Sequence, residues 1–246
     1  MGDNDLKGVS QVYPVHEMFH TFQGEGVHMG KLAFFVRLFG CPVKCPWCDS
    51  AGTWHPDYVP KDITRMSPDS IVEQAVASGA RILVVTGGEP AIHDLRNLAN
   101  AAHAEGLLVH LETSGGFPIK GYIDWITLSP KKWKLPLAEN VKVANEFKFI
   151  IETAEDIKFY FEMIKELGYD PQDPLNEDEV PIWLHPEWGQ SKNGGTLGAI
   201  CKAVKEQGPQ GTFRAGWQLH KLYDIDRMDS RSRKLVPLGG DPKRGY

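Results

Sequence analysis

The chain has 246 residues and a formal net charge of −5, from 27 Lys and Arg against 32 Asp and Glu. A chain of this length folds as one generous α/β domain or two small ones, and it needs neither disulfides nor a metal for stability. The negative charge argues against a nucleic-acid binder, which would usually present a basic face. Residues 1–11 are polar, and no apolar run reaches the ~20 residues that span a bilayer, so we expect a cytoplasmic protein.

The first half of the chain is predicted to alternate between strands and helices. An extended segment at 13–22 precedes 32–39 (LAFFVRLF), a run apolar enough for a strand that is buried on both faces. A helix at 68–78 follows, with Ser67 as its N-cap and Gly79 just past its C-terminal end. The remaining elements of this half are a strand at 81–86, a helix at about 94–105 and a strand at 107–112.

The second half continues the same alternation. Apolar residues at helical spacing predict a helix over 154–167, and the acidic, proline-containing segment 169–180 predicts a loop. The other expected elements are strands at 122–128, 146–151, 181–185 and 213–219, a helix at 196–206, and a basic surface extension at 230–246. This alternation predicts an α/β fold with a mainly parallel sheet, open or curled into a partial barrel.

Three of the four cysteines fall within eight residues, as Cys41, Cys45 and Cys48 in a C-x3-C-x2-C pattern. In a reducing compartment such clustering indicates a metal or catalysis rather than disulfides. Three thiolates on one loop can hold three irons of a cubane and leave the fourth iron open to a small molecule. Structural zinc stays open as an alternative, with His55 or Cys201 as the fourth ligand. We otherwise expect Cys201, in an apolar helix-like stretch, to be a small buried side chain.

A glycine pair follows the strand at 81–86, within Thr86-Gly87-Gly88-Glu89-Pro90. The carboxyl end of a strand is where α/β folds bind ligands, and two glycines let the backbone approach a ligand closely. Glu89 can accept hydrogen bonds from an ammonium group. A glycine pair after a strand is also typical of an ordinary tight turn, so its weight depends on the cysteine pattern that precedes it.

Together these two motifs resemble the radical S-adenosylmethionine superfamily. More narrowly, the chain is similar to the 7-carboxy-7-deazaguanine synthase family in Gln23-Gly24-Glu25-Gly26, Arg37, Cys48-Asp49, Glu112-Thr113-Ser114-Gly115, Ser129-Pro130-Lys131 and Gln218-Leu219-His220-Lys221. The resemblance covers residues 12–226 in order. It implies one partial (β/α) barrel domain of the radical S-adenosylmethionine type over 12–226, between a polar extension at 1–11 and a basic one at 227–246.

The family resemblance implies a reaction and its cofactors. Members convert 6-carboxy-5,6,7,8-tetrahydropterin to 7-carboxy-7-deazaguanine with loss of ammonia, a step toward queuosine and other deazapurines. They use a [4Fe-4S] cluster, S-adenosylmethionine and Mg²⁺, usually pair as homodimers, and imply an electron donor of flavodoxin or ferredoxin type. The cluster would cleave the sulfonium of S-adenosylmethionine to a 5′-deoxyadenosyl radical, while the protein positions the reacting atoms and excludes water.

The resemblance also implies roles for individual residues. Cys41, Cys45 and Cys48 would hold the cluster, and Ser50, where relatives usually have threonine, would supply a hydroxyl to Mg²⁺. The S-adenosylmethionine contacts would be Gly87, Gly88, Glu89, Ser129, Pro130, Lys131, His185 and Pro186. The substrate contacts would be Phe22, Gln23, Gly24, Glu25, Arg37, Thr86, His220 and Asp226.

Three of these assignments have alternatives. Arg37 suits a substrate carboxylate as a bidentate donor, but it could instead form a surface ion pair. His185-Pro186 stands where relatives commonly have Gln-Pro, and a core or surface histidine is the alternative. Asp226 falls where many relatives end; its carboxylate would replace their chain terminus, unless it simply begins a loose tail.

Two rival functions remain at this point. The first is an activase that makes a glycyl radical on a partner protein, since activases also carry C-x3-C-x2-C on short chains. The Gln-Gly-Glu-Gly and Gln-Leu-His-Lys segments argue against it, because an activase has no pterin to hold. The second is a non-catalytic interaction protein with zinc or an iron–sulfur cluster, for which the Gly-Gly-Glu-Pro motif would be an accident.

Overall fold

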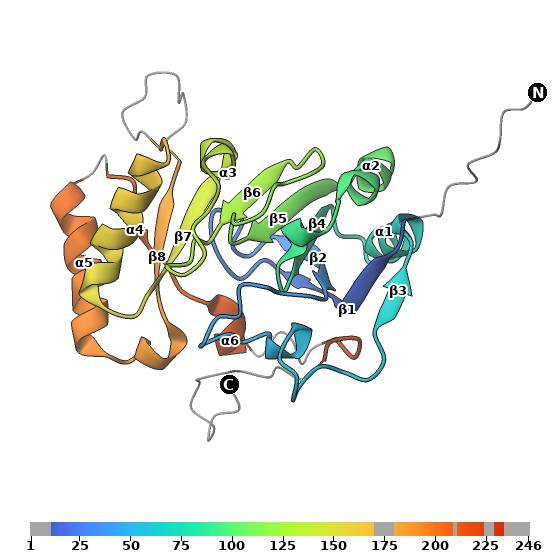
Figure 1. The fold of residues 1–246 in the computed structure, drawn as a ribbon, viewed down its shortest axis with the longest axis horizontal. Coiled ribbons are helices and arrows are strands. Elements are labelled where there is room, and N and C mark those ends of the chain that lie inside the picture. The colour runs from blue at the N-terminus through green and yellow to red at the C-terminus, as the bar shows by residue number, and fades with distance from the viewer. Residues whose placement is uncertain (1–10, 170–179, 209–210, 224–228, 234–246) are drawn as a thin grey trace, which may run out of the picture.

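One curved sheet with helices on its outer face forms the protein (Figure 1). This computed structural model describes residues 11–169, 180–208, 211–223 and 229–233. The strands are β1 Tyr13–Phe22, β2 Leu32–Leu38, β3 Thr64–Met66, β4 Ile82–Gly87, β5 Leu108–Thr113, β6 Trp125–Leu128, β7 Glu146–Ile151, β8 Ile182–Pro186 and β9 Phe213–Ala215. The α-helices are α1 Pro68–Ala77, α2 Arg96–Ala104, α3 Ala138–Val143, α4 Ala154–Glu166, α5 Gly194–Gln207 and α6 Leu219–Tyr223.

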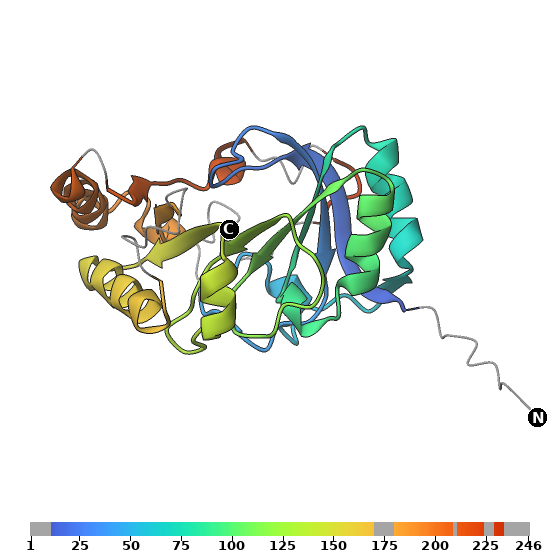
Figure 2. The same ribbon diagram turned by 90° about the horizontal axis from the view of Figure 1, so that it is seen from above.

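The strand order is β3-β1-β2-β4-β5-β6-β7-β8-β9. Every pair from β2 to β9 is parallel, whereas β1 is antiparallel to both β2 and β3. Seen from above, the sheet curves, and α1 to α5 lie along its convex side (Figure 2). The expectation of a mainly parallel sheet curled into a partial barrel is confirmed. Within the described residues, no helix is long and apolar enough to cross a membrane.

Alternation along each strand divides the sheet into an apolar outer face and an inner face that carries the polar groups of the site beside a smaller apolar cluster of Phe19, Ala33, Phe35, Ile82 and Val84. On β5, Leu111 packs into the outer core, while its neighbour Glu112 lines a cavity on the inner face. Phe147 and Lys148 divide in the same way on β7. The strands therefore build the core and the site at once.

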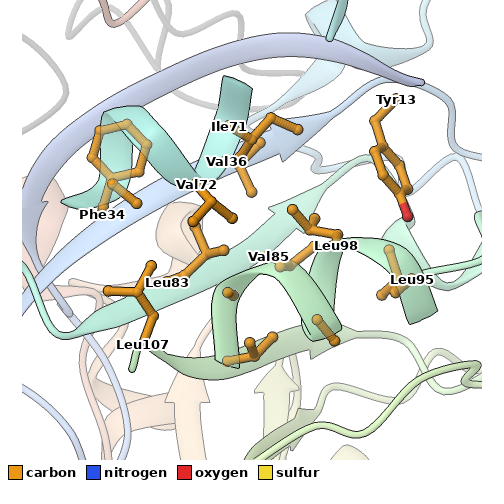
Figure 3. Close-up of a cluster of buried hydrophobic side chains, with 14 of the residues drawn as sticks. Tyr13, Phe34, Val36, Ile71, Val72, Leu83, Val85, Leu95, Leu98 and Leu107 are labelled. Carbon is orange, nitrogen blue, oxygen red and sulfur yellow. The ribbon is translucent and has the colours of Figure 1, made fainter. Parts of the chain in front are cut away.

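The outer core has two parts. The first lies under α1 and α2, where Phe34, Ile71, Leu83 and Leu98 are fully buried side chains from β2, α1, β4 and α2 (Figure 3). The second lies under α4 and α5, against β7 and β8. At ~25 cal/mol per Å² of apolar surface, burial on this side stabilises the fold while leaving the inner face free for chemistry.

Local signals set the ends of α1 and α4. Ser67 caps α1 as expected, with its Oγ accepting a hydrogen bond from the Ser70 N–H at 3.2 Å, and Gly79 follows the helix with φ +77°. Thr153 and Asp156 form a capping box at the start of α4. The predicted helices and strands agree with the observed ones to within a few residues, except at the C-terminal end.

Two expectations were wrong. The strand expected at 213–219 ends at Ala215, and Leu219 begins α6; between them, Gly216 leaves no room for a Cβ beside the His185 ring. Cys201 is exposed rather than buried. It lies on α5 one residue beyond Ile200, so the helical turn that buries Ile200 directs Cys201 to solvent.

The described part of the C-terminal extension contacts β1. The Asp229 carboxylate accepts a hydrogen bond from the His20 N–H at 2.8 Å, and the Arg233 N–H donates to Glu17 Oε2 at 2.5 Å. These five residues, 229–233, therefore lie on the surface, as expected for an extension, but they are tied to the sheet.

Leu111→Ala should lower the free energy of unfolding by about 2–5 kcal/mol, because it leaves a cavity in the outer core. Leu108→Ala, on the same strand but at a side chain that is 48% exposed, should change it by less than about 0.5 kcal/mol. Guanidinium unfolding of both variants measures the difference. Equal losses would show that β5 does not present Leu111 to the core.

Candidate active site

A cavity opens on the inner face of the sheet, with about 1300 Å³ of empty space including the part open to solvent. Its wall combines strand ends with three loops that the sequence singled out: the cysteine loop 41–48, the turn after β4 and the segment before α6. The expected site residues that line it are Phe22, Gln23, Gly24, Glu25, Arg37, Cys41, Cys45, Cys48, Ser50, Thr86, Gly87, Gly88, Glu89, Ser129, Lys131 and His220. One cavity thus brings together segments nearly 200 residues apart.

The cysteine loop begins directly after β2 and turns back at Lys44, whose φ of +54° is the one left-handed value among the described non-glycine residues. Burial raises the pKa of Cys45 to about 11 and that of Cys48 to about 12, and it also raises the pKa of Cys41. Such thiols ionise at neutral pH only when a metal replaces the proton.

The donor set fits a cubane better than zinc. Among the described residues, no three His, Cys, Asp or Glu side chains gather around one point as single-ion ligands. A cubane instead takes one thiolate per iron, so its cysteines stand further apart. The candidate fourth zinc ligands are engaged elsewhere: His55 Nδ1 accepts a hydrogen bond from the Asp57 N–H at 3.3 Å, and Cys201 is exposed on α5.

Two tryptophans, Trp47 within the cysteine loop and Trp133 outside it, pack together beside the cysteines. Trp133 donates to the Val43 carbonyl at 2.8 Å and meets the Trp47 ring edge to face at 6.1 Å between centroids. Trp47 in turn donates to Glu152 at 3.0 Å. These contacts fix the loop and place apolar rings beside the thiols, as needed to limit solvent access.

The glycine pair is required by the chain itself. A Cβ on Gly87 would lie 2.2 Å from the Leu38 carbonyl oxygen, and one on Gly88 would lie 2.3 Å from that of Gly40 and 2.7 Å from Cys41 Cβ. The motif was expected to let the backbone approach a ligand closely. In the structure the glycine pair lies this close to the residues that lead into the cysteine loop. Backbone hydrogen bonds from Gly88 to Leu38 (3.0 Å) and from Glu89 to Gly40 (2.8 Å) fix it.

Glu89 joins the end of β4 to the end of β5, a role that was not predicted from the sequence. Its carboxylate accepts hydrogen bonds from the hydroxyl of Thr113 at 2.6 Å, the N–H of Ser114 at 2.8 Å, the Ser114 hydroxyl, and the N–H of Ala91 at 3.0 Å. The end of β4 is thereby fixed to the end of β5. An ammonium group at Glu89 would share oxygens that already accept these donors.

Lys131 is buried beside the cysteines. Its Nζ donates to the Ser129 carbonyl at 2.5 Å and to the Ser129 hydroxyl at 2.8 Å, and it lies 5.6 Å from the centre of the Trp47 ring. Burial lowers the pKa of Lys131. The expected contact segment Ser129–Lys131 thus presents one hydroxyl and one ammonium to the cavity, whereas Pro130 does not line it.

Arg37 is not a surface ion pair. Its Nε donates to Glu17 at 2.6 Å, and a second guanidinium nitrogen donates to the Ser50 hydroxyl at 3.0 Å. Ser50 in turn donates to Asp49 at 3.1 Å, and the other Asp49 oxygen lies 3.2 Å from Lys221 Nζ. Although burial opposes ionisation, Lys221, His220 and Arg37 hold the pKa of Asp49 well below its usual range.

A second polar cluster surrounds Lys148 on β7. Its Nζ pairs with Glu25 and lies 3.4 Å from Glu112, while Gln23 donates to Glu112 at 2.9 Å. His220 Nδ1 lies 3.5 Å from Glu25. Burial would raise the pKa of Glu25, but Lys148, His185 and His220 hold it at about 2. Glu25 is therefore an anion in the cavity at neutral pH.

Besides Pro130, two expected residues do not line the cavity. Pro186 and His185 on β8 do not line the cavity; His185 is fully buried with neither ring nitrogen hydrogen-bonded among the described residues. Burial lowers the pKa of His185 to about 4, so it is neutral, as a core histidine would be. Asp226 lies outside the described residues, and the structure does not place its carboxylate.

Sequence reasoning missed several lining residues as site residues, among them Asp49, Glu112, Lys148, Trp188 and Lys221. One signal was present for Lys148, because a charged residue within the apolar run 146–151 (EFKFII) must face a partner. Arg37, assigned from the family resemblance, lies in a similarly apolar run at 32–39. Lys221 carried no such signal, because it lies beyond the strand expected at 213–219 and no helix was expected there.

Gly88→Ala should reduce iron incorporation several-fold, because its Cβ must displace Gly40 and Cys41. Iron and sulfide per chain after anaerobic reconstitution measure the effect. Gly198→Ala, at a position on α5 with nothing within 4 Å, is the matched control and should keep full iron content. Full iron in Gly88→Ala would contradict the tight approach.

The free energy of unfolding should fall as the pH drops from about 6.5 to about 4, because His185 has a folded-state pKa of about 4 and the unfolded chain takes up the proton first. His185→Leu should reduce the slope by about 1.4 kcal/mol per pH unit in that window, the value for one proton. Denaturant unfolding at a series of pH values measures it. Leu184→Val should lower stability without changing the slope, and an unchanged slope in His185→Leu would contradict a neutral His185.

Comparison with known proteins agrees with this geometry. Residues 36–169 match the model of the Radical SAM superfamily. A 7-carboxy-7-deazaguanine synthase from Synechocystis sp. is 44% identical over 72% of this chain and 78% of its own length. One from Prochlorococcus marinus is 39% identical over 88% of this chain and all of its own. The crystal structure of QueE from Escherichia coli superposes with a TM-score of 0.70 at 30% identity, covering 85% of this chain and 95% of that one. The chain therefore belongs to the 7-carboxy-7-deazaguanine synthase family of the radical S-adenosylmethionine superfamily.

Proposed function

We propose that this chain converts 6-carboxy-5,6,7,8-tetrahydropterin to 7-carboxy-7-deazaguanine with loss of ammonia, on the route to queuosine and related deazapurines. The observation that carries the proposal is that one cavity holds both the cysteine loop and a buried cluster of carboxylates, amide and lysine suited to a flat polar heterocycle. Membership of the synthase family sets aside the activase and the interaction protein. The catalytic domain in this proposal spans 12–226.

A [4Fe-4S] cluster on Cys41, Cys45 and Cys48, with S-adenosylmethionine on its open iron, would supply the radical chemistry. The chain's own part at this end is to hold the cofactor. Backbone groups of Gly87 and Gly88 and the hydroxyl and ammonium groups of Ser129 and Lys131 face the cavity for that purpose.

The substrate would lie between Arg37 and the Lys148 cluster. The 2-amino and ring N–H groups of a pterin are hydrogen-bond donors. The carboxylates of Glu25 and Glu112, which line the cavity, can accept hydrogen bonds from them. Its 6-carboxylate suits Arg37, and Thr86 and His220 add polar contacts. Phe19, Phe22 and Phe35 line the same cavity and would exclude water from the reacting carbon.

Mg²⁺ and the partner proteins extend the proposal. Hard cations prefer oxygen ligands, which Ser50 and the adjoining carboxylate of Asp49 offer at the rim of the substrate site. A flavodoxin- or ferredoxin-type donor would reduce the cluster, and a homodimer would be the working form, as the resemblance implies.

The reconstituted protein, incubated anaerobically with S-adenosylmethionine, dithionite, Mg²⁺ and the carboxytetrahydropterin, should form 7-carboxy-7-deazaguanine, detected by mass spectrometry. Cys45→Ala should abolish the product, because the cluster loses a ligand. Cys201→Ser, at an exposed thiol remote from the cavity, should retain it. Cleavage of S-adenosylmethionine to 5′-deoxyadenosine without the product would keep the superfamily chemistry and refute the substrate.

A further inference from the structure

Four polar side chains form a closed ring in the wall of the cavity. Gln23 Nε2 donates to Glu112 Oε1 at 2.9 Å, and Glu112 Oε2 lies 3.4 Å from Lys148 Nζ. Lys148 pairs with Glu25 Oε2, and the Glu25 N–H donates to the Gln23 side-chain oxygen at 3.2 Å. The ring joins the loop after β1 to β5 and β7, and each member lines the cavity.

The ring holds two carboxylates and one ammonium group away from bulk water. The exposed fractions of the side chains are 13% for Lys148, 8% for Glu25 and 22% for Glu112. Burial works against the charge on Lys148, yet Glu112 and Glu25 hold its pKa well above its usual range. Lys148 is therefore a permanent cation that neutralises one of the two negative charges.

Without that cation, two carboxylates would share a space of low dielectric. Both carboxylates contact the same Nζ atom, so without it they would share one buried site, and repulsion between like charges there favours retention of one proton by the pair. When a carboxylate takes up a proton, one of its oxygens becomes an O–H donor and the group loses part of its capacity to accept hydrogen bonds. The cavity would then offer one anionic acceptor where it now offers two.

We propose that Lys148 is a positioning residue, which keeps Glu25 and Glu112 both ionised and fixed in place so that each accepts a hydrogen bond from an N–H group of the pterin ring. The inference rests on the proposed function, because it assigns that substrate's donor edge to these carboxylates. Lys148 acts through the two carboxylates, since its Nζ donates to Glu25 and to Glu112.

Other titratable groups also face the ring. His220 on α6 lies 3.5 Å from Glu25, His185 is buried beside it on β8, and Lys131, in the loop after β6, interacts electrostatically with Lys148. The amide of Gln218 adds a donor 3.4 Å from Glu25. His185 is neutral above about pH 4, and among the described residues Lys148 is the cation that contacts both carboxylates.

The test compares Lys148→Met with Lys148→Arg, and uses Lys158→Met as the matched control, because Lys158 pairs with Glu162 on the outer surface of α4. kcat and KM for the carboxytetrahydropterin are measured from pH 6 to pH 9, with iron content and circular dichroism to confirm folding. At pH 7, Lys148→Met should raise KM about tenfold or more and change kcat much less. The increase should shrink toward pH 9, as the shared proton leaves. The KM of Lys148→Arg should stay within about threefold of the wild-type value. The KM of Lys158→Met should equal that of the wild type.

A merely structural role predicts a different result: KM raised equally at every pH, or kcat and KM changed together. Either outcome, or an unchanged KM in Lys148→Met, would overturn the inference. If that variant does not fold, Lys148→Met combined with Glu112→Gln decides, because removing one carboxylate also removes the shared proton and with it the pH dependence. Absence of product from the wild-type enzyme would instead refute the proposed function and is therefore distinguishable.

Discussion

The contact between the loop after β2 and the turn after β4 is the constraint on which the rest of the site depends. The parallel register places Leu38 beside Gly87, so the cysteine loop and the glycine pair leave the sheet at the same point. Two backbone hydrogen bonds join them there, and Glu89 extends the connection to Thr113 and Ser114. Three strand ends are thus held as one rigid edge, where the geometry that radical chemistry needs can be maintained.

The same strands that present this edge also separate two kinds of interior. Outward-facing residues of β4, β5 and β7 pack under helices. The inward-facing residues of the same strands include Thr86, Glu112 and Lys148, which line the cavity. Buried charge is tolerated on the inner face because each charged group has a partner from another strand or loop. The site is therefore built from strand residues together with the loops after β1, β2, β4 and β6 and with α6.

The sequence predicts what local pattern determines and misses what depends on distant contacts. The strands 32–39 and 81–86 are evident because apolar residues dominate both runs, and the cysteine spacing indicates the cluster without any fold. The helix α6 is not evident, because its five residues are held by a contact between Leu219 and Gly24 across the barrel. Lys148 carried a signal that went unused, whereas the pairing of Glu89 with Thr113 and Ser114 required the strand order.

The glycine pair has a bearing on how such proteins are recognised. Since Leu38, Gly40 and Cys41 leave no room for a Cβ at either position, both glycines would have to persist in any descendant that kept these two loops in contact, even one that had stopped binding S-adenosylmethionine. Retention of the pair in a divergent homologue therefore reports that the loops still meet. Loss of catalysis would be recorded first at positions under no such steric demand, such as Ser129, Lys131 and Lys148.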